Sequence, residues 1–313
     1  MKKIAFHANQ LSLRGTEIAL YTYAKYNEEI LGNKSVIFSN PAGNLDSLDK
    51  FKDRFEVKLI NFWEYESYLK NNDFDFLYVI KAGNNDGYWV ESTPTIVHTV
   101  FNYNEPHGYK YLYVSDWLCK NQGYSTETHS LPHICEKLPT PLYSLREKLN
   151  FKDTDVVYGC YGGATEFNIE FVKEIIIKLV NKRDDLKFIF MNINKFVDNP
   201  NVIFLEGTYD LQEKSAFVNA CDAMIHARYG GETFGLAISE FALENKPIIT
   251  FGDSGERSHI EIMGERGIYY NNPDELELIF TNLKSYIKYD DYYLPYLQFS
   301  PEIIMDKFNK FIS

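Results

Sequence analysis

Two glutamates eight residues apart, Glu232 and Glu240, stand in the part of this sequence that carries most of its chemistry. They bracket Thr-Phe-Gly-Leu at residues 233–236, and we expect a helix to begin near Gly235, followed by a short apolar strand at 248–251. The first turn of a helix leaves backbone N–H groups without partners inside the helix, which suits an anion. The stretch therefore predicts an anion site that has carboxylates beside it.

Carboxylates are unsuitable neighbours for a bare phosphate. Two like unit charges about 3.5 Å apart repel by roughly 5 kcal/mol at an effective dielectric constant near 20. The arrangement makes sense if the ligand also carries hydroxyl groups, because a carboxylate is a good acceptor for them. A nucleotide-sugar has both parts, a diphosphate for the amides and hydroxyls for the glutamates.

The same stretch resembles the donor site of retaining glycosyltransferases of the GT-B fold, in particular glycosyltransferase family 4. Members carry two glutamates at this spacing around a Phe-Gly-Leu core, then a helix of small residues and a Pro-Val/Ile strand. Here the core is residues 233–236 and the strand begins at Pro247-Ile248-Ile249. An exposed helix start with two solvated acids is the alternative, but Gly235 would be a costly residue inside an ordinary helix.

The resemblance implies roles for single residues. Glu240 is expected on the ribose hydroxyls and Glu232 on sugar hydroxyls near the reacting centre. A glycine-containing loop after the first strand, residues 9–16, is expected to approach the diphosphate or the sugar, although a glycine before a helix is also ordinary turn chemistry. The donor-binding residues expected in addition to Glu240 are Gly15, Thr16, Gly163, Thr233, Phe234, Gly235 and Leu236.

The chain departs from the family at the cations that stabilise a leaving diphosphate. Members have an Arg and a Lys after the first strand of the second domain, whereas residues 161–168 here read YGGATEFN. Arg228, four residues before Glu232, is the best-placed substitute, because an arginine fork suits a diphosphate; a salt bridge to a nearby acid is its alternative role. Arg14 and Arg257 are second candidates.

His98 lies in an apolar strand expected at residues 95–101. The resemblance implies that it contacts the donor sugar and joins Arg228 and Glu232 as a catalytic residue, while a hydrogen-bonded core histidine is the alternative. Asp73-Phe74-Asp75 could be read as an Asp-x-Asp metal-binding motif. It precedes a strand rather than following one, however, and this is the wrong end of a parallel sheet for a ligand. We therefore expect no required metal and no cofactor beyond the nucleotide-sugar substrate.

Composition excludes some classes of partner. The formal net charge is −12, from 44 acidic and 32 basic residues, which argues against a nucleic-acid backbone. No apolar run reaches the length of a membrane span. The helix expected at 17–31, with Thr16 as its N-cap, sets Lys25 against three glutamates, so there is no strong membrane-binding signal. We expect a soluble glycan, glycoprotein or small-molecule acceptor. The four cysteines lack metal-ligand spacing and are expected to be reduced, buried thiols in a cytoplasmic protein.

Apolar runs alternate with helical patterns from end to end, which is typical of parallel α/β architecture. With the resemblance, this implies the GT-B fold: two facing Rossmann-like, doubly wound domains and a C-terminal helix that crosses back to the first domain. The expected divisions are 1–136 for the acceptor-side domain, 137–298 for the donor domain and 299–313 for the crossover helix. Twelve strands are expected, at 3–7, 35–39, 57–61, 76–81, 95–101, 111–114, 156–161, 186–191, 202–205, 223–227, 247–251 and 267–270.

Other functions stay open at this stage. A sugar-nucleotide epimerase of the same architecture would need acid and base groups around the sugar ring, and no clear histidine–carboxylate set is visible. A non-catalytic nucleotide-sugar-binding relative would explain the missing Arg–Lys pair. A dehydrogenase is disfavoured, since no G-x-G-x-x-G follows the first strand.

Overall fold

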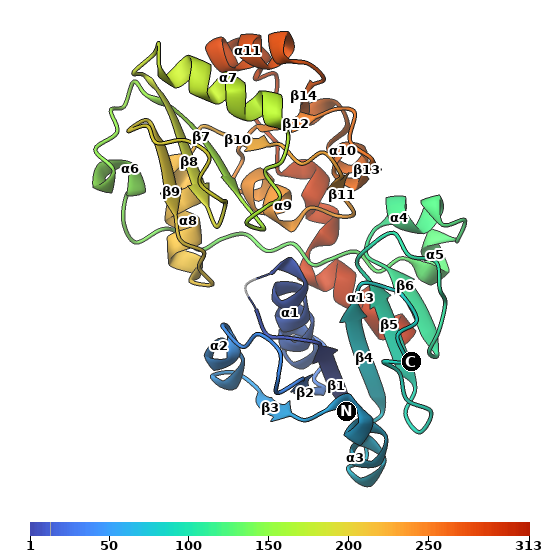
Figure 1. The fold of residues 1–313 in the computed structure, drawn as a ribbon. Helices are drawn as coiled ribbons and strands as arrows, with labels where there is room; N and C mark the ends of the chain where they lie inside the picture. Colours follow the sequence, from blue (N-terminus) through green and yellow to red (C-terminus); the bar gives the residue numbers. More distant parts are fainter. Residues whose placement is uncertain (13) are drawn as a thin grey trace. The chain divides into compact units, whose positions relative to one another are not determined.

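The computed structural model describes residues 1–12 and 14–313 of the chain and divides them into two compact units. One contains Met1–Ile134 together with Phe299–Ser313, and the other contains Cys135–Gln298. We call them the first and second domains (Figure 1). Between the last strand of the first domain and the first helix of the second, residues 131–141 form no helix or strand.

The first domain is built on a parallel six-stranded sheet in the order β3-β2-β1-β4-β5-β6. Its middle strands are almost entirely buried, because helices cover both faces, and for that reason most of their residues are apolar. The strands are β1 (Lys3–Ala8), β2 (Lys34–Ser39), β3 (Glu56–Leu59), β4 (Phe76–Lys81), β5 (Thr95–Thr99) and β6 (Lys110–Tyr113).

Helices α1 (Gly15–Glu29) and α13 (Pro301–Phe311) cover one face of this sheet, so the C-terminal helix packs on the first domain (Figure 1). Phe308 of α13 lies within ring-contact distance of Phe6, Tyr23 and Tyr78. On the opposite face, Tyr65 and Leu69 of α3 (Tyr65–Asn71) pack against side chains of β1, β2 and β4. The other helices of this domain are α2 (Leu48–Lys52), η1 (Phe62–Glu64), α4 (Asp116–Asn121) and α5 (Thr126–His129).

The second domain repeats the plan with a sheet in the order β14-β12-β10-β7-β8-β9. Phe280 packs on Tyr158 and Phe188 on one face of the sheet, while Phe217 and Phe241 contact Tyr161 on the other. The strands are β7 (Val156–Tyr161), β8 (Leu186–Met191), β9 (Val202–Leu205), β10 (Ala223–His226), β12 (Ile248–Phe251) and β14 (Ile268–Tyr270).

Helices and a small two-stranded sheet complete the second domain. The small sheet pairs β11 (Gly231–Glu232) with β13 (Glu256–Arg257) in parallel. The helices are α6 (Leu145–Lys148), α7 (Glu170–Val180), α8 (Leu211–Ala220), α9 (Leu236–Leu243), α10 (Ser258–Met263), η2 (Gly264–Arg266), α11 (Pro273–Thr281), α12 (Leu283–Tyr286) and η3 (Leu294–Phe299).

Every strand expected from the sequence is present in one of the two six-stranded sheets, so the two doubly wound, Rossmann-like domains are confirmed, and the C-terminal helix packs on the first domain as expected. One expected detail is wrong: Thr16 does not cap the first helix, because the helix begins at Gly15 and its cap residue is Arg14. Helix α8 and strands β11 and β13 were not expected. They are polar or very short, so they carry little hydrophobic period.

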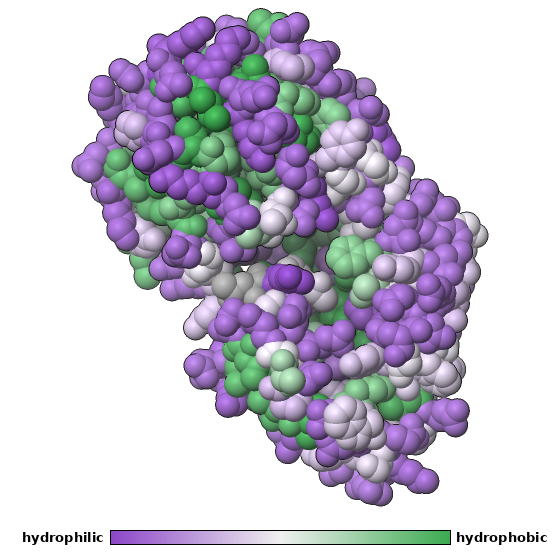
Figure 2. All heavy atoms as spheres, viewed as in Figure 1, coloured by the Kyte–Doolittle hydropathy of each residue, from purple (hydrophilic) through white to green (hydrophobic). Residues whose placement is uncertain are grey.

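Hydrophilic side chains cover most of the face shown in Figure 2, with smaller hydrophobic areas between them. Within the part of the chain that the structure describes, no helix has both the length and the apolar character needed to span a bilayer. All four cysteines are free and buried.

Candidate functional site

The strand order of the second domain identifies an edge where a ligand can bind. The order reverses between β7 and β10, and open parallel sheets bind ligands outside the carboxyl ends of their strands at such a switch point. Strand β7 ends at Tyr161 and β10 ends at His226. The loops that follow contain Gly163 and Arg228, which were expected to take part in donor binding and catalysis.

Arg228 lies between two carboxylates at this edge. Its Nε is 2.6 Å from Glu166 Oε2, and its Nη1 is 3.1 Å from Glu232 Oε2. Neighbouring backbone bonds fix the loop, since Asn168 N–H donates to the Ala227 carbonyl and Asn168 Oδ1 accepts from Tyr229 N–H. The salt bridge foreseen as the alternative for Arg228 is thus present, and it holds the guanidinium at the switch point.

Glu232 is also held from its other oxygen. Oε1 lies 3.2 Å from His226 Nε2, His226 Nδ1 lies 2.8 Å from Thr250 Oγ1, and that hydroxyl lies 3.2 Å from Nε2 of His259. An ionised carboxylate can only accept, so His226 Nε2–H donates to it and His226 Nδ1 can accept from Thr250. Thr250 Oγ1 then accepts from His259 Nε2–H.

The electrostatics keep Glu232 ionised. Burial alone would raise the pKa of its carboxyl, but the hydrogen bond from His226 and the charge of Arg228 outweigh it and lower the pKa from 4.5 to about 2. Burial lowers the pKa of His259 to about 3, so that ring is neutral near pH 7. Burial raises the pKa of Glu256, although the charge of Arg228 acts against that shift.

The lowered pKa of Glu232 predicts how stability depends on pH. A group whose pKa is lower in the folded state stabilises the fold above its unfolded pKa and loses that contribution as the pH falls. We expect the free energy of unfolding of wild type to exceed that of Glu232→Gln by a margin that shrinks by about 3 kcal/mol between pH 6 and pH 2. Urea denaturation across that range measures it, with the exposed Glu174→Gln as control. Parallel curves for wild type and Glu232→Gln would contradict the assignment.

The turn between Glu232 and α9 depends on a glycine. Gly235 has φ +95° and is the cap residue of α9, a left-handed conformation that side chains adopt at a cost. Because the chain turns there, α9 begins at Leu236. The N–H groups of its first turn, which have no partners inside the helix, are therefore close in sequence to Glu232. Thr233 and Phe234 form the turn itself. The helix start expected from the sequence is confirmed.

Glu240 lies one turn inside α9 and contacts two residues from other elements. Lys214 Nζ is 2.7 Å from Oε1 and 2.6 Å from Oε2, and the hydroxyl of Tyr161 donates to Oε2. The side chains of Lys214 and Glu240 are 6% and 14% exposed, so this ion pair is mostly shielded from water. A carboxylate held by donors at both oxygens is fixed in its direction.

Three expected site residues belong to other surroundings. Gly15 and Thr16 start α1, directly after the first strand of the first domain; Leu13 of the same loop lies outside the described residues. His98 is fully buried, with Nδ1 2.5 Å from the Tyr78 hydroxyl and its ring edge-on to Tyr23. Burial lowers the pKa of His98 to about 3. A sugar contact by His98 stays a prediction, and the burial of the ring disfavours it.

Sequence reasoning gave no role to His226, Lys214 or Glu166. The only signal for His226 was its place at the end of a strand, and a lone histidine there is common in cores. Of the two second-choice cations, Arg257 donates to the Gly252 carbonyl and Arg14 is the cap residue of α1.

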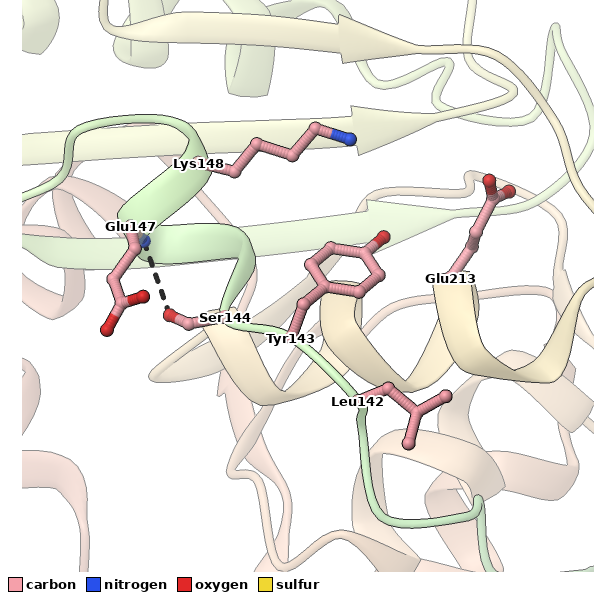
Figure 3. Close-up of a pocket in the computed structure, with 6 residues that line it drawn as sticks. All are labelled: Leu142, Tyr143, Ser144, Glu147, Lys148 and Glu213. Atoms are coloured by element: carbon pink, nitrogen blue, oxygen red, sulfur yellow. Dashed lines mark hydrogen bonds between the residues drawn. The ribbon is translucent and has the colours of Figure 1, made fainter.

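A hollow of about 620 Å³ lies elsewhere on the second domain, between the segment before α6 and helix α8 (Figure 3). Tyr143, Lys148 and Glu213 point toward the same space, and the Ser144 hydroxyl accepts from Glu147 N–H. Glu213 of α8 lines this hollow, whereas the next residue, Lys214, bonds to Glu240. The hollow contains none of the residues expected in the site, and we assign no ligand to it.

No protein-family model matches the chain, and no curated protein sequence matches it. Solved structures do. HepE from Anabaena in complex with UDP-glucose superposes with a TM-score of 0.77 at 13% identity, covering 100% of this chain and 99% of HepE. A glycosyltransferase from Rickettsia africae gives 0.71 at 13% identity over 99% and 97% of the two chains, and sucrose-phosphate synthase from Thermosynechococcus elongatus gives 0.69 at 11% over 99% and 98%. At these identities the likeness establishes the fold, and it extends over whole chains. The protein therefore has the two-domain GT-B architecture.

Proposed function

We propose that the protein is a glycosyltransferase that moves a sugar from a nucleoside-diphosphate-sugar donor to an acceptor. The observation that carries this proposal is the cluster at the switch point of the second domain. It brings an arginine and the start of α9 together with two carboxylates, Glu232 and Glu240, that are held by donors from other elements. The UDP-glucose bound to HepE supports the donor class, and the names of the Rickettsia and Thermosynechococcus proteins support the reaction class.

Each part of the cluster suits one part of such a donor. N–H groups at the start of α9, from Phe234, Gly235 and Leu236, bind the diphosphate together with Gly163. Arg228 neutralises the charge that develops as the sugar–phosphate bond breaks. Glu232 accepts hydrogen bonds from sugar hydroxyls, and Glu240 accepts them from the ribose. Gly15 and Thr16, in the first domain, are proposed as further donor contacts.

Retention of configuration and membership of glycosyltransferase family 4 are part of the proposal through the resemblance of residues 232–240. Independence from metals is part of the proposal because Asp73-Phe74-Asp75 precedes a strand instead of following one. A soluble glycan, glycoprotein or small-molecule acceptor is part of it because the helix that contains Lys25 is not polybasic. The departure from the family's Arg–Lys pair is the reason why Arg228 has the central role.

The test is to incubate the protein with a panel of nucleotide-sugars and to follow the free nucleoside diphosphate, with and without candidate acceptors. Release that an acceptor stimulates supports transfer. Binding without turnover would favour a non-catalytic relative, and a changed sugar still attached to the nucleotide would favour an epimerase. Analysis of the anomeric configuration of the product by NMR decides between retention and inversion.

A further inference from the structure

Lys214 is the most deeply buried cation near the proposed donor site, and the residue roles described so far do not use it. It lies on α8, whereas Glu240 lies on α9 and Tyr161 ends β7. These three elements meet on one face of the second sheet, where Phe217 of α8 and Phe241 of α9 pack against the Tyr161 ring. The Lys214 ammonium lies 5.0 Å from the centre of that ring. The cluster thus has an aromatic wall and an ion pair in its middle.

The position of Lys214 is costly for a residue that serves stability alone. Taking an ammonium group out of water costs free energy, which a single ion pair offsets only when its geometry is good. Surface ion pairs elsewhere in the domain, such as Lys178–Glu277 at 2.6 Å, avoid that cost. Lys214 instead contacts both oxygens of Glu240, the acid proposed to bind ribose, with its side chain only 6% exposed.

We propose that Lys214 is a positioning residue that, with the Tyr161 hydroxyl, orients the Glu240 carboxylate so that the enzyme distinguishes a ribonucleotide donor from its 2′- or 3′-deoxy analogue. This inference rests on the proposed function. The ribose hydroxyl is the donor and a Glu240 oxygen is the acceptor. Lys214 and Tyr161 hold the carboxylate in one orientation before the ligand arrives, so that little ordering is left for binding.

The size of the effect follows from the strength of such a bond. A hydrogen bond to a charged group corresponds to roughly a ten- to hundredfold change in affinity. The wild-type protein should therefore bind a ribonucleoside diphosphate at least about tenfold more tightly than the corresponding 2′- or 3′-deoxy compound. Without Lys214 the carboxylate is free to turn away, and this ratio should fall toward one.

The experiment begins with calorimetric titration of the wild-type protein with UDP, GDP, ADP, CDP and dTDP. The tightest of these bases is then compared in its ribo, 2′-deoxy and 3′-deoxy forms on wild type, Lys214→Met, Lys214→Arg and Tyr161→Phe. We expect Lys214→Met to lose the preference, Lys214→Arg to restore most of it and Tyr161→Phe to reduce it. Lys178→Met, which removes a surface ion pair in the same domain, should keep the wild-type ratio.

The outcomes separate the two proposals. If no nucleoside diphosphate binds to wild type, the proposed function fails. If one binds, and Lys214→Met and Tyr161→Phe keep the wild-type ribose preference, only the role of Lys214 is overturned. If the role of Lys214 is purely structural, Lys214→Met should lower the melting temperature and weaken the binding of ribo and deoxy ligands equally. That result also overturns the inference. Should Lys214→Met fail to fold, Tyr161→Phe provides the same test, because it removes one donor and keeps the ring.

Discussion

Arg228→Gln is expected to lower turnover at least about a hundredfold while weakening the binding of the nucleotide-sugar much less. Glutamine is shorter than arginine but keeps two N–H donors, and it has no positive charge. Removing a donor that stabilises developing charge costs about 10²–10³ in rate in enzymes of known mechanism, because that charge is largest in the transition state. Steady-state release of nucleoside diphosphate gives the turnover number and KM separately.

A matched control for this variant is Arg183→Gln in the same domain. Arg183 also makes a 2.6 Å ion pair with an acid, Asp185, but it lies away from the switch point. The variant Arg183→Gln should leave turnover unchanged. Arg228→Lys should recover part of the lost rate, since lysine has the charge without the planar fork. Unchanged turnover in Arg228→Gln would remove the arginine from the mechanism.

Glu166 gives a test of opposite sign for the same guanidinium. It lies 2.6 Å from Arg228 Nε, so it occupies an N–H donor that a diphosphate would use, and its negative charge repels the negatively charged diphosphate. Its side chain is 41% exposed. Glu166→Gln is therefore expected to tighten the binding of the nucleoside diphosphate. A weaker affinity in this variant would mean that Glu166 helps to bind the ligand instead of competing with it.

Gly231→Ala is expected to lower the free energy of unfolding by about 3 kcal/mol or more. Gly231 has φ +74°, and an added Cβ would lie 2.0 Å from the backbone carbonyl oxygen of Glu256, its partner in the small sheet. Backbone atoms in a paired strand cannot move aside cheaply, and a left-handed residue with a side chain adds its own cost. Because Glu232 follows directly, turnover should fall as well. Urea denaturation measures the first effect.

The neighbouring glycine is a natural control. Gly230 is exposed, and an added Cβ there meets no atom within 4 Å. Gly230→Ala should change the free energy of unfolding by no more than about 0.5 kcal/mol. Equal losses in the two variants would show that the small sheet does not constrain the loop that contains Glu232.

The two-domain fold could be predicted from the sequence because its strands are buried on both faces. A strand of that kind is mostly apolar, and the predicted bounds of β7 and β8 agree with the structure to the residue. The start of α9 could also be predicted, since Gly235 between Phe234 and Leu236 indicates a left-handed turn before a helix. Helix α8 was missed because its buried face includes Lys214 and Ser215 and has little hydrophobic period.

Only the tertiary structure decided which side chains meet. The pairing of β10 with β12 places His226 beside Thr250, 24 residues away, and the packing of α8 against α9 places Lys214 on Glu240, 26 residues away. Sequence spacing cannot show such contacts, because the register of parallel strands and the rotation of each helix about its axis depend on the whole core. The residue types around Glu232 and Glu240 indicated the chemistry, and the fold determined which cation and which histidine hold each carboxylate.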